Sequence, residues 1–244
     1  MEQNPCIPWI LPQNAVHVWR VDLKQPETLV AACRNILNTS EQERADRFYW
    51  AADQAKYIIS HAAVRGLLGA YLRVPPKILA FVPNPYGKPE LSNLSAGSLH
   101  FNLSHSGDLG LIAISHGMVG VDVEQQRNRG NVIEMAQQVF APSEYTVLQR
   151  LPDHEKLGAF FRLWVRKEAF TKALGLGLNL PLNRFEVDLT SPRLLSLNGE
   201  SRLADGWHIH DLHIDSGYTA AVVWQGPRQV LPRALNSNQL RSLI

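Results

Sequence analysis

Three carboxylates and two lysines stand on two short segments in a pattern suited to binding a divalent cation and a polyphosphate. The first segment reads G-V-D-V-E over residues 120–124, and the second reads W-x-x-K-E-A-x-x-K over residues 164–172. Carboxylate oxygens are hard ligands of the kind that Mg²⁺ prefers. If the two segments meet in the folded chain, the sequence predicts an enzyme of phosphoryl chemistry.

Asp122 and Glu124 alternate with two valines, which is typical of a strand. Their side chains then leave the same face, with Cα atoms about 6.7 Å apart. Two carboxylates this close repel each other unless a cation neutralises them. Taken alone, the pair is more typical of a solvated strand face.

A row of side chains on one helix face favours a metal-binding role over a solvated one. Leu157, Phe161, Trp164, Glu168 and Lys172 recur at helical spacing, so they share one face. A glutamate among apolar side chains is partly buried and needs a partner, because burial disfavours its charged form. An intrahelical Glu168–Lys172 pair, worth only about 0.2–0.5 kcal/mol, explains the spacing but not the apolar surroundings.

Further candidate ligands stand in two other segments. In the segment 102–107, His105 and the hydroxyl of Ser104 are candidate phosphate contacts, but neighbouring strand residues point apart, so they do not form a nucleophile pair. We find no acyl-transfer triad. Lys88, in a Gly-Lys-Pro turn, is a candidate anion ligand, although a single lysine of this kind is more typical of a solvated loop.

Two weaker patterns complete the candidates. Arg47 and Arg65 lie eighteen residues apart and share a face if one helix runs unbroken between them. The histidines of segment 208–213 lack a carboxylate or cysteine at metal-binding spacing, so a structural role is favoured for them.

The elements that must position these residues follow from periodicity and from turn residues. Ser40 and Glu43 predict a capping box that opens a long helix over 41–72, and a pair of prolines at 75–76 ends it. Three strands are expected to form a meander before the helices of the second half. The predicted strands are 16–23, 99–103, 109–115, 118–124, 184–189, 207–213 and 218–224, and the later helices are 132–139, 143–150 and 153–174.

This order of elements predicts the α+β class with two similar α/β subdomains. We place the N-terminal subdomain at 1–118 and the C-terminal subdomain, with the metal site, at 119–225. Residues 226–244 follow a Gly-Pro pair and are expected to form a mobile polar tail.

Composition narrows the function classes. The chain has 244 residues, a formal charge of +2 and 19% charged residues, and this charge is too small to indicate nucleic-acid binding by itself. Its two cysteines, Cys6 and Cys33, form neither a metal motif nor a disulfide framework, which favours a reducing cytoplasm. No signal peptide or membrane-spanning stretch is recognisable, so we expect a cytoplasmic protein without membrane contact.

The motifs, taken together, resemble one family. G-K-P at 87–89, N-x-S-H at 102–105, G-x-D-x-E at 120–124 and W-x-x-K-E-A-x-x-K at 164–172 occur in the order found in 4′-phosphopantetheinyl transferases of the surfactin-synthetase-activating (Sfp) type. The resemblance spans about residues 40–190. It implies a monomer built like two fused copies of a half-length carrier-protein synthase, a pseudo-dimer with the active site between its halves.

The resemblance also assigns residues. It implies that Asp122, Glu124 and Glu168 hold Mg²⁺, with Mn²⁺ as a substitute, and that Glu168, Lys172 and His105 are catalytic. The residues implied to contact coenzyme A are Arg47, Arg65, Lys88, Ser104, His105, Asp122, Lys167 and Lys172.

The reaction implied is transfer of the phosphopantetheine arm of coenzyme A to a serine of an acyl or peptidyl carrier protein. In this hypothesis the serine attacks the β-phosphate, and Glu168 accepts its proton directly or through a metal-bound water. Lys172 stabilises or protonates the departing 3′,5′-ADP. One alternative is a magnesium-dependent nucleotide phosphodiesterase that needs no protein acceptor. A nucleic-acid-binding module, considered because of a pI near 8.6, ranks last since no basic run or reader motif is present.

Overall fold

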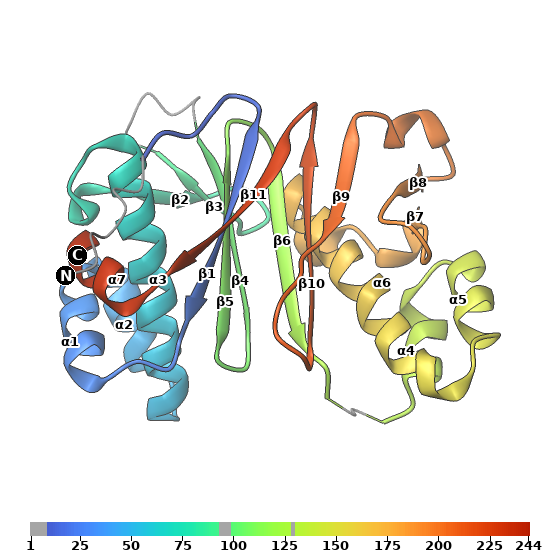
Figure 1. Cartoon of the computed structure of the whole chain (residues 1–244), viewed down its shortest axis with the longest axis horizontal. Helices are drawn as coiled ribbons and strands as arrows, with labels where there is room; N and C mark the ends of the chain where they lie inside the picture. The colour runs from blue at the N-terminus through green and yellow to red at the C-terminus, as the bar shows by residue number, and fades with distance from the viewer. Residues whose placement is uncertain (1–8, 93–98, 128–129) are drawn as a thin grey trace, which may run out of the picture.

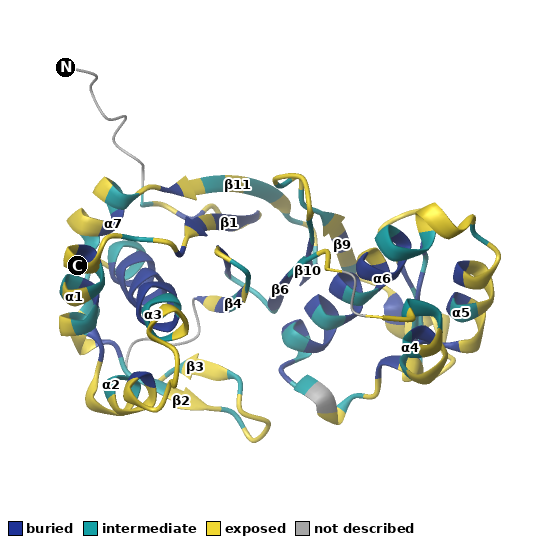
Figure 2. Cartoon of the chain, turned by 90° about the horizontal axis from the view of Figure 1, so that it is seen from below, coloured by how far each residue is buried: buried dark blue, intermediate teal, exposed yellow. Residues whose placement is uncertain are grey.

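Two halves, each with a sheet and a long helix, lie side by side in the computed structural model, as two views turned by 90° show (Figure 1, Figure 2). The structure describes residues 9–92, 99–127 and 130–244, so Cys6 lies outside it. Helix α3 (Ala51–Leu72) belongs to the first half and helix α6 (Asp153–Leu174) to the second, and each has 22 residues. The predicted α+β class with two similar halves is confirmed.

The first half contains a four-stranded sheet in the order β11-β1-β5-β4. Its strands are β1 (Ala15–Asp22), β4 (His100–Ser106), β5 (Leu109–Ser115) and β11 (Gln229–Leu235), with β11 parallel to β1 and the other pairs antiparallel. Its helices are α1 (Glu27–Ile36), α2 (Thr39–Asp46), α3 and α7 (Ser237–Leu243). A separate hairpin comprises β2 (Phe81–Pro83) and β3 (Pro89–Leu91).

The second half contains a three-stranded antiparallel sheet in the order β6-β10-β9. Helix α6 packs against β6 and β10. The elements of this half are β6 (Val119–Gln125), α4 (Val132–Val139), α5 (Pro142–Gln149), α6, β7 (Phe185–Val187), β8 (Leu194–Leu197), β9 (Trp207–Asp211) and β10 (Tyr218–Gln225).

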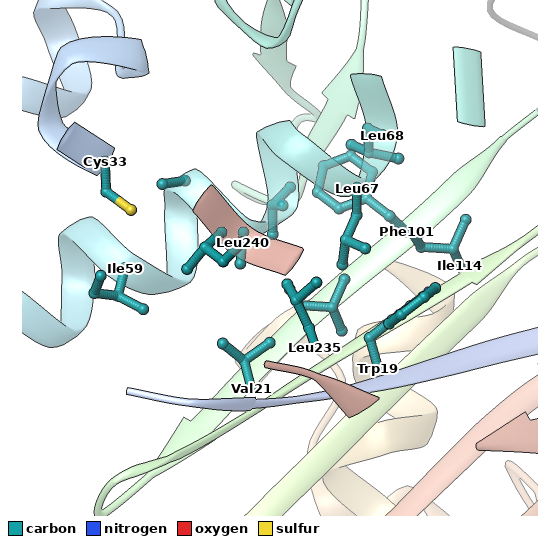
Figure 3. Packing of buried hydrophobic residues seen from close by; sticks show 14 of the residues in the cluster. Trp19, Val21, Cys33, Ile59, Leu67, Leu68, Phe101, Ile114, Leu235 and Leu240 are labelled. Atoms are coloured by element: carbon teal, nitrogen blue, oxygen red, sulfur yellow. The ribbon is translucent and has the colours of Figure 1, made fainter. Parts of the chain in front are cut away.

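Three apolar clusters hold the layers together. In the first, α3 and α7 cover one face of β1 and β11, with Trp19, Leu67 and Leu235 among the buried side chains (Figure 3). The second surrounds α6. The third lies between the two sheets, where Val18 of β1 and Val121 of β6 are buried in one cluster. Strand β1 is therefore covered on both faces, and the halves are joined by apolar packing of one sheet on the other.

The long N-terminal helix that the sequence predicted is two helices. The capping box consists of Asn38 and Glu41 and opens α2, so the prediction of Ser40 and Glu43 was wrong. Arg47 ends α2, and Trp50 has extended backbone before α3 begins. Arg47 and Arg65 consequently do not lie on one continuous helix, and the argument from their spacing fails.

The expected meander was also wrong at its third strand. Strands β4 and β5 form a hairpin, but β6 leaves their sheet and pairs with β10. The backbone N–H groups of β6 that face β4 donate hydrogen bonds to polar side chains of β4 instead, as described below.

The segment after Gly226 is not the tail that we expected. It contains β11 and α7, and the buried Leu235 and Leu240 anchor it in the core of the first half. Asn236 and Gln239 form a capping box that starts α7. Two buried leucines in a polar segment gave too weak a pattern for prediction.

His17 makes the fold sensitive to acid. It is buried on β1 and accepts a hydrogen bond from Tyr71, and burial followed by the charge of Arg233 lowers its pKa to about 4. Because folding favours the neutral ring, stability present above pH 6.5 is lost as the pH falls towards 4. We expect this group to remove about 2 kcal/mol from the free energy of unfolding between roughly pH 7.5 and pH 5. Urea unfolding of wild type and His17→Gln at both values measures it, and parallel pH dependence in the two proteins would contradict it.

Within residues 9–92, 99–127 and 130–244, none of the helices is long and apolar enough to cross a membrane.

Candidate active site

Three elements from both halves converge on Asp122. This residue of β6 is 3% exposed, and its Oδ1 accepts hydrogen bonds from Lys172 Nζ of α6 at 2.6 Å and from Ser104 Oγ of β4 at 2.8 Å. Lys172 Nζ also donates to Ser104 Oγ at 3.0 Å. The predicted meeting of the lysine from the W-x-x-K-E segment with the first acid of G-x-D-x-E is therefore present in the structure.

A ladder of polar side chains on β4 fixes the register of β6. Asn102, Ser104 and Ser106 lie on the face of β4 that meets β6, and their side-chain oxygens accept hydrogen bonds from the backbone N–H groups of Val121, Val123 and Gln125 at 2.9, 3.4 and 3.0 Å. Side chains thus replace the usual backbone ladder between the two strands.

The same ladder orients the acids. Ser104 donates to Asp122, and Ser106 Oγ donates to Glu124 Oε2 at 2.9 Å. Sequence reasoning missed Asn102 and Ser106, although the alternation N-x-S-x-S places all three polar side chains on one strand face.

Glu168 completes a cluster of acids. It is half-buried, and its pKa is raised by burial, by the negative charge of Asp122 and by that of Glu124, while Lys172 opposes the shift. Burial also raises the pKa of Asp122 despite Lys172 and Ser104. The three predicted acids are therefore close enough for their charges to interact.

The cluster fits a hard cation in its chemistry, but no coordination sphere is preassembled. Asp122 Oδ2 is buried without a hydrogen-bond partner among the described residues, and a buried carboxylate oxygen in that state is costly. A divalent cation would satisfy it. In the described part of the chain, however, no three His, Cys, Asp or Glu side chains are arranged as a metal-binding group, and Lys172 is bonded to the other oxygen of Asp122.

Apolar clefts flank Trp164 beside these acids. One is lined by Glu124, Val132, Met135, Phe160 and Phe161 together with Trp164. The other lies on the side of Glu168 and is lined by residues of the segment 180–183 and of α4. The charged cluster therefore adjoins apolar surface, which the row of side chains on one helix face indicated only in part.

His105 and Lys88 are placed differently from each other. His105 is exposed on the face of β4 opposite Ser104, and its pKa is lowered by desolvation and then by the charges of His61 and Lys172. Lys88 directs its ammonium to backbone carbonyl groups at the end of α6, and burial lowers its pKa to about 8.

Two residues expected to contact coenzyme A are buried and make hydrogen bonds to other residues of the protein. Lys167 is fully buried, and its Nζ donates to Glu144 Oε1 at 2.5 Å and to the carbonyl of Phe185 at 2.6 Å. Arg65 is also fully buried and bonds Glu41 and two backbone carbonyl groups. Charged residues on long helices look alike in sequence whether they face solvent, a ligand or a buried partner.

Arg47 remains exposed at the end of α2, in a shallow surface depression lined also by Arg44 and Phe48. The structure therefore leaves it free to meet an anion, but it does not bring Arg47 into the Asp122 network.

Comparison with known proteins assigns the chain to a family. A model of the N-terminal part of 4′-phosphopantetheinyl transferases matches residues 22–117, and a model of the 4′-phosphopantetheinyl transferase superfamily matches residues 118–223. The transferase HetI of Nostoc is 36% identical over 87% of this chain and 89% of its own length. The chain belongs to the 4′-phosphopantetheinyl transferase superfamily.

The phosphopantetheinyl transferase Sfp of Bacillus subtilis is 29% identical over 77% of this chain and 82% of its own length. Part of the chain also resembles Helicobacter pylori holo-[acyl-carrier-protein] synthase solved with coenzyme A, at 20% identity and a TM-score of 0.35, over 43% of this chain and 97% of that one. So low a TM-score supports no inference about the site. The resemblance predicted from the four motifs is confirmed by the sequence relatives.

Proposed function

We propose that this phosphopantetheinyl transferase moves the 4′-phosphopantetheine arm of coenzyme A to a serine of an acyl or peptidyl carrier protein and releases 3′,5′-ADP. The observation that carries the proposal is the network of Lys172, Asp122 and Ser104 beside Glu168 at the junction of the halves. The network places the ammonium of Lys172, which can pair with a phosphate leaving group, next to the carboxylate of Glu168, which can accept a proton.

Glu168 and Lys172 have complementary roles in this proposal. The serine oxygen forms a bond to the β-phosphorus, and the bond from that phosphorus to the oxygen of 3′,5′-ADP breaks. Glu168, directly or through a bound water, takes the serine proton. Lys172 offsets the charge that develops on the departing phosphate, and exposed His105 contacts a phosphate of coenzyme A.

Asp122, Glu124 and Glu168 would hold Mg²⁺, or Mn²⁺ in its place. The unpartnered Oδ2 of Asp122 supports this assignment. When bound, the cation supplies positive charge that neutralises the pyrophosphate. Binding requires Lys172 to leave or share Asp122, and a phosphate group is a suitable new partner for its ammonium.

We also propose that one copy of the chain is sufficient and that it works in the cytoplasm. Both halves of the site come from a single chain, since β4 supplies Ser104 while β6 and α6 supply Asp122 and Lys172. The free thiol of Cys33 is compatible with a reducing compartment.

A transfer assay tests the function and the metal together. Incubation with Mg²⁺, coenzyme A and an apo carrier protein is expected to add the mass of one phosphopantetheinyl group to the carrier, as measured by mass spectrometry. Excess EDTA is expected to abolish the addition, and Mg²⁺ or Mn²⁺ to restore it. A carrier whose serine is replaced by alanine is the control. Coenzyme A cleavage without any change in the carrier would contradict the proposal and favour a hydrolase.

A further inference from the structure

The hairpin of the first half reaches the C-terminal end of α6 in the second half. Asn84, in the loop between β2 and β3, donates from Nδ2 to the carbonyl of Gly175 at 2.9 Å. Lys88 Nζ donates to the carbonyls of Lys172 at 2.8 Å and Ala173 at 3.4 Å. Two side chains of one loop therefore contact the last turn of the helix that carries Glu168 and Lys172.

The same ammonium also contacts β6. Lys88 Nζ donates to the carbonyl of Val119 at 3.2 Å, where β6 begins. An ammonium has three N–H groups, and here it has three carbonyl partners. In this conformation the hydrogen-bond partners of the Lys88 ammonium among the described residues are backbone carbonyl groups.

This contact is favourable for a physical reason. The last carbonyl groups of a helix have no partner within the helix, and the helix dipole places partial negative charge there. The Lys172 carbonyl accepts from the backbone N–H of Gly175 at 3.2 Å, and the half-buried ammonium adds a second donor and a positive charge there. The carbonyl groups in turn compensate the loss of solvent that lowers the pKa of Lys88.

Asn84 fixes the loop that presents Lys88. Its Oδ1 accepts from the backbone N–H groups of Tyr86 and Lys88, both at 2.9 Å, and Gly87 between them has a φ of +91°. The side chain of Asn84 closes the turn together with two backbone hydrogen bonds, from Asn84 N to the Lys88 carbonyl at 2.8 Å and from Gly87 N to the Asn84 carbonyl at 2.9 Å. The same side chain also bonds α6 through its amide nitrogen.

The consequence lies in the active site. Val119 precedes Asp122 by three residues on β6, and Lys172 contributes both the carbonyl that Lys88 contacts and the ammonium that reaches Asp122 Oδ1 at 2.6 Å. One cation from the first half therefore links the two elements of the second half whose alignment brings Lys172 to Asp122.

We propose that the ammonium of Lys88 is a positioning group: through the carbonyls of Val119, Lys172 and Ala173 it holds α6 in register with β6 instead of binding a phosphate of coenzyme A. This inference rests on the proposed transfer activity for its kinetic test. It replaces the role that the sequence resemblance implied for Lys88.

The test compares Lys88→Met with Lys88→Arg and with Lys77→Met, a matched control that removes an exposed lysine of the same half. We expect Lys88→Met to lower kcat about 10- to 100-fold, because a small displacement of catalytic groups has effects of that size. The KM for coenzyme A should stay within about threefold of wild type. Lys88→Arg, which can still donate to carbonyl groups, should recover part of kcat.

A rise in KM for coenzyme A of about tenfold with kcat preserved would overturn the proposal and identify Lys88 as a ligand. Unchanged kcat and KM would overturn it as well. If Lys88→Met does not fold, Asn84→Ala is the variant that tests the proposal. It keeps the ammonium of Lys88 but removes the side-chain hydrogen bonds that hold the loop in place. A fall in kcat without a change in KM is expected for it, and an unaltered kcat contradicts the proposal.

Hydrogen exchange separates this proposal from the transfer activity. Amide exchange near the end of α6 and the start of β6 should be faster in Lys88→Met than in wild type and in Lys77→Met, with or without turnover. If wild type fails to transfer but exchange changes as expected, the proposed function fails and the positioning role stands. Unchanged exchange would refute the positioning role by itself.

Discussion

Replacing Glu168 by glutamine is expected to abolish transfer while leaving the protein folded. The amide keeps the size of the side chain but cannot accept the proton of the carrier serine, and it is a weaker ligand for a cation. Loss of a general base typically costs about 10²- to 10⁴-fold in rate, and loss of a metal ligand adds to that cost. The rate of carrier modification under saturating coenzyme A and Mg²⁺ measures the effect.

The melting temperature of Glu168→Gln shows whether a loss of activity reflects a loss of folding. The charges of Asp122 and Glu124 and the burial of the side chain all disfavour the ionised form of Glu168, so the neutral amide should leave the melting temperature equal or higher. Glu155→Gln, at an exposed position near the start of α6, is the matched control and should retain full activity. Near-normal transfer by Glu168→Gln would remove Glu168 from its role as base.

Gly120→Ala is expected to be the most damaging small substitution in the structure. An added Cβ at Gly120 would lie 2.1 Å from the backbone oxygen of Ala169 and 2.4 Å from the backbone nitrogen of Ala173. Neither backbone atom can yield as a flexible side chain can, so α6 must move away from β6. Overpacking of this kind costs about 3 kcal/mol or more, which corresponds to a fall in melting temperature of roughly 10 °C for a chain of this size.

The displacement should also separate Lys172 from Asp122, so transfer should fall even where the variant remains folded. Gly158→Ala is the control on the same helix, because nothing lies within 4 Å of its added Cβ. Alanine there should stabilise the helix by up to about 1 kcal/mol. A variant at position 120 with wild-type stability and activity would show that β6 and α6 are not in the close contact described.

The sequence predicted what depends on local pattern. The strand of Asp122 and the helix of Glu168 have strong periodicity and clear end signals, and both were placed within a few residues of their observed bounds. The three acids proposed for the site were chosen from their spacing on these elements and from the resemblance to a family.

What sequence reasoning missed depends on pairing between distant residues. Lys167 faces the buried Glu144 of α5 and not a ligand, and Glu144 lies 23 residues away along the chain. The partner of β6 was mistaken because short turns between the three strands predict a meander. No local pattern shows that the side chains of Asn102 and Ser106 bond the backbone N–H groups of β6. The contacts of Lys88 likewise join segments that no local pattern relates.

The return of β11 to the first sheet has a consequence for synthesis. In the chain, residues 119–225 stand between two segments of the first half. They are therefore synthesised before β11, the strand that pairs with one edge of β1. Until β11 arrives, one edge of β1 is open to pairing with foreign chains. Translation that stops early should therefore yield aggregation-prone fragments, whereas the second half has its own helices and sheet in sequence and can form first.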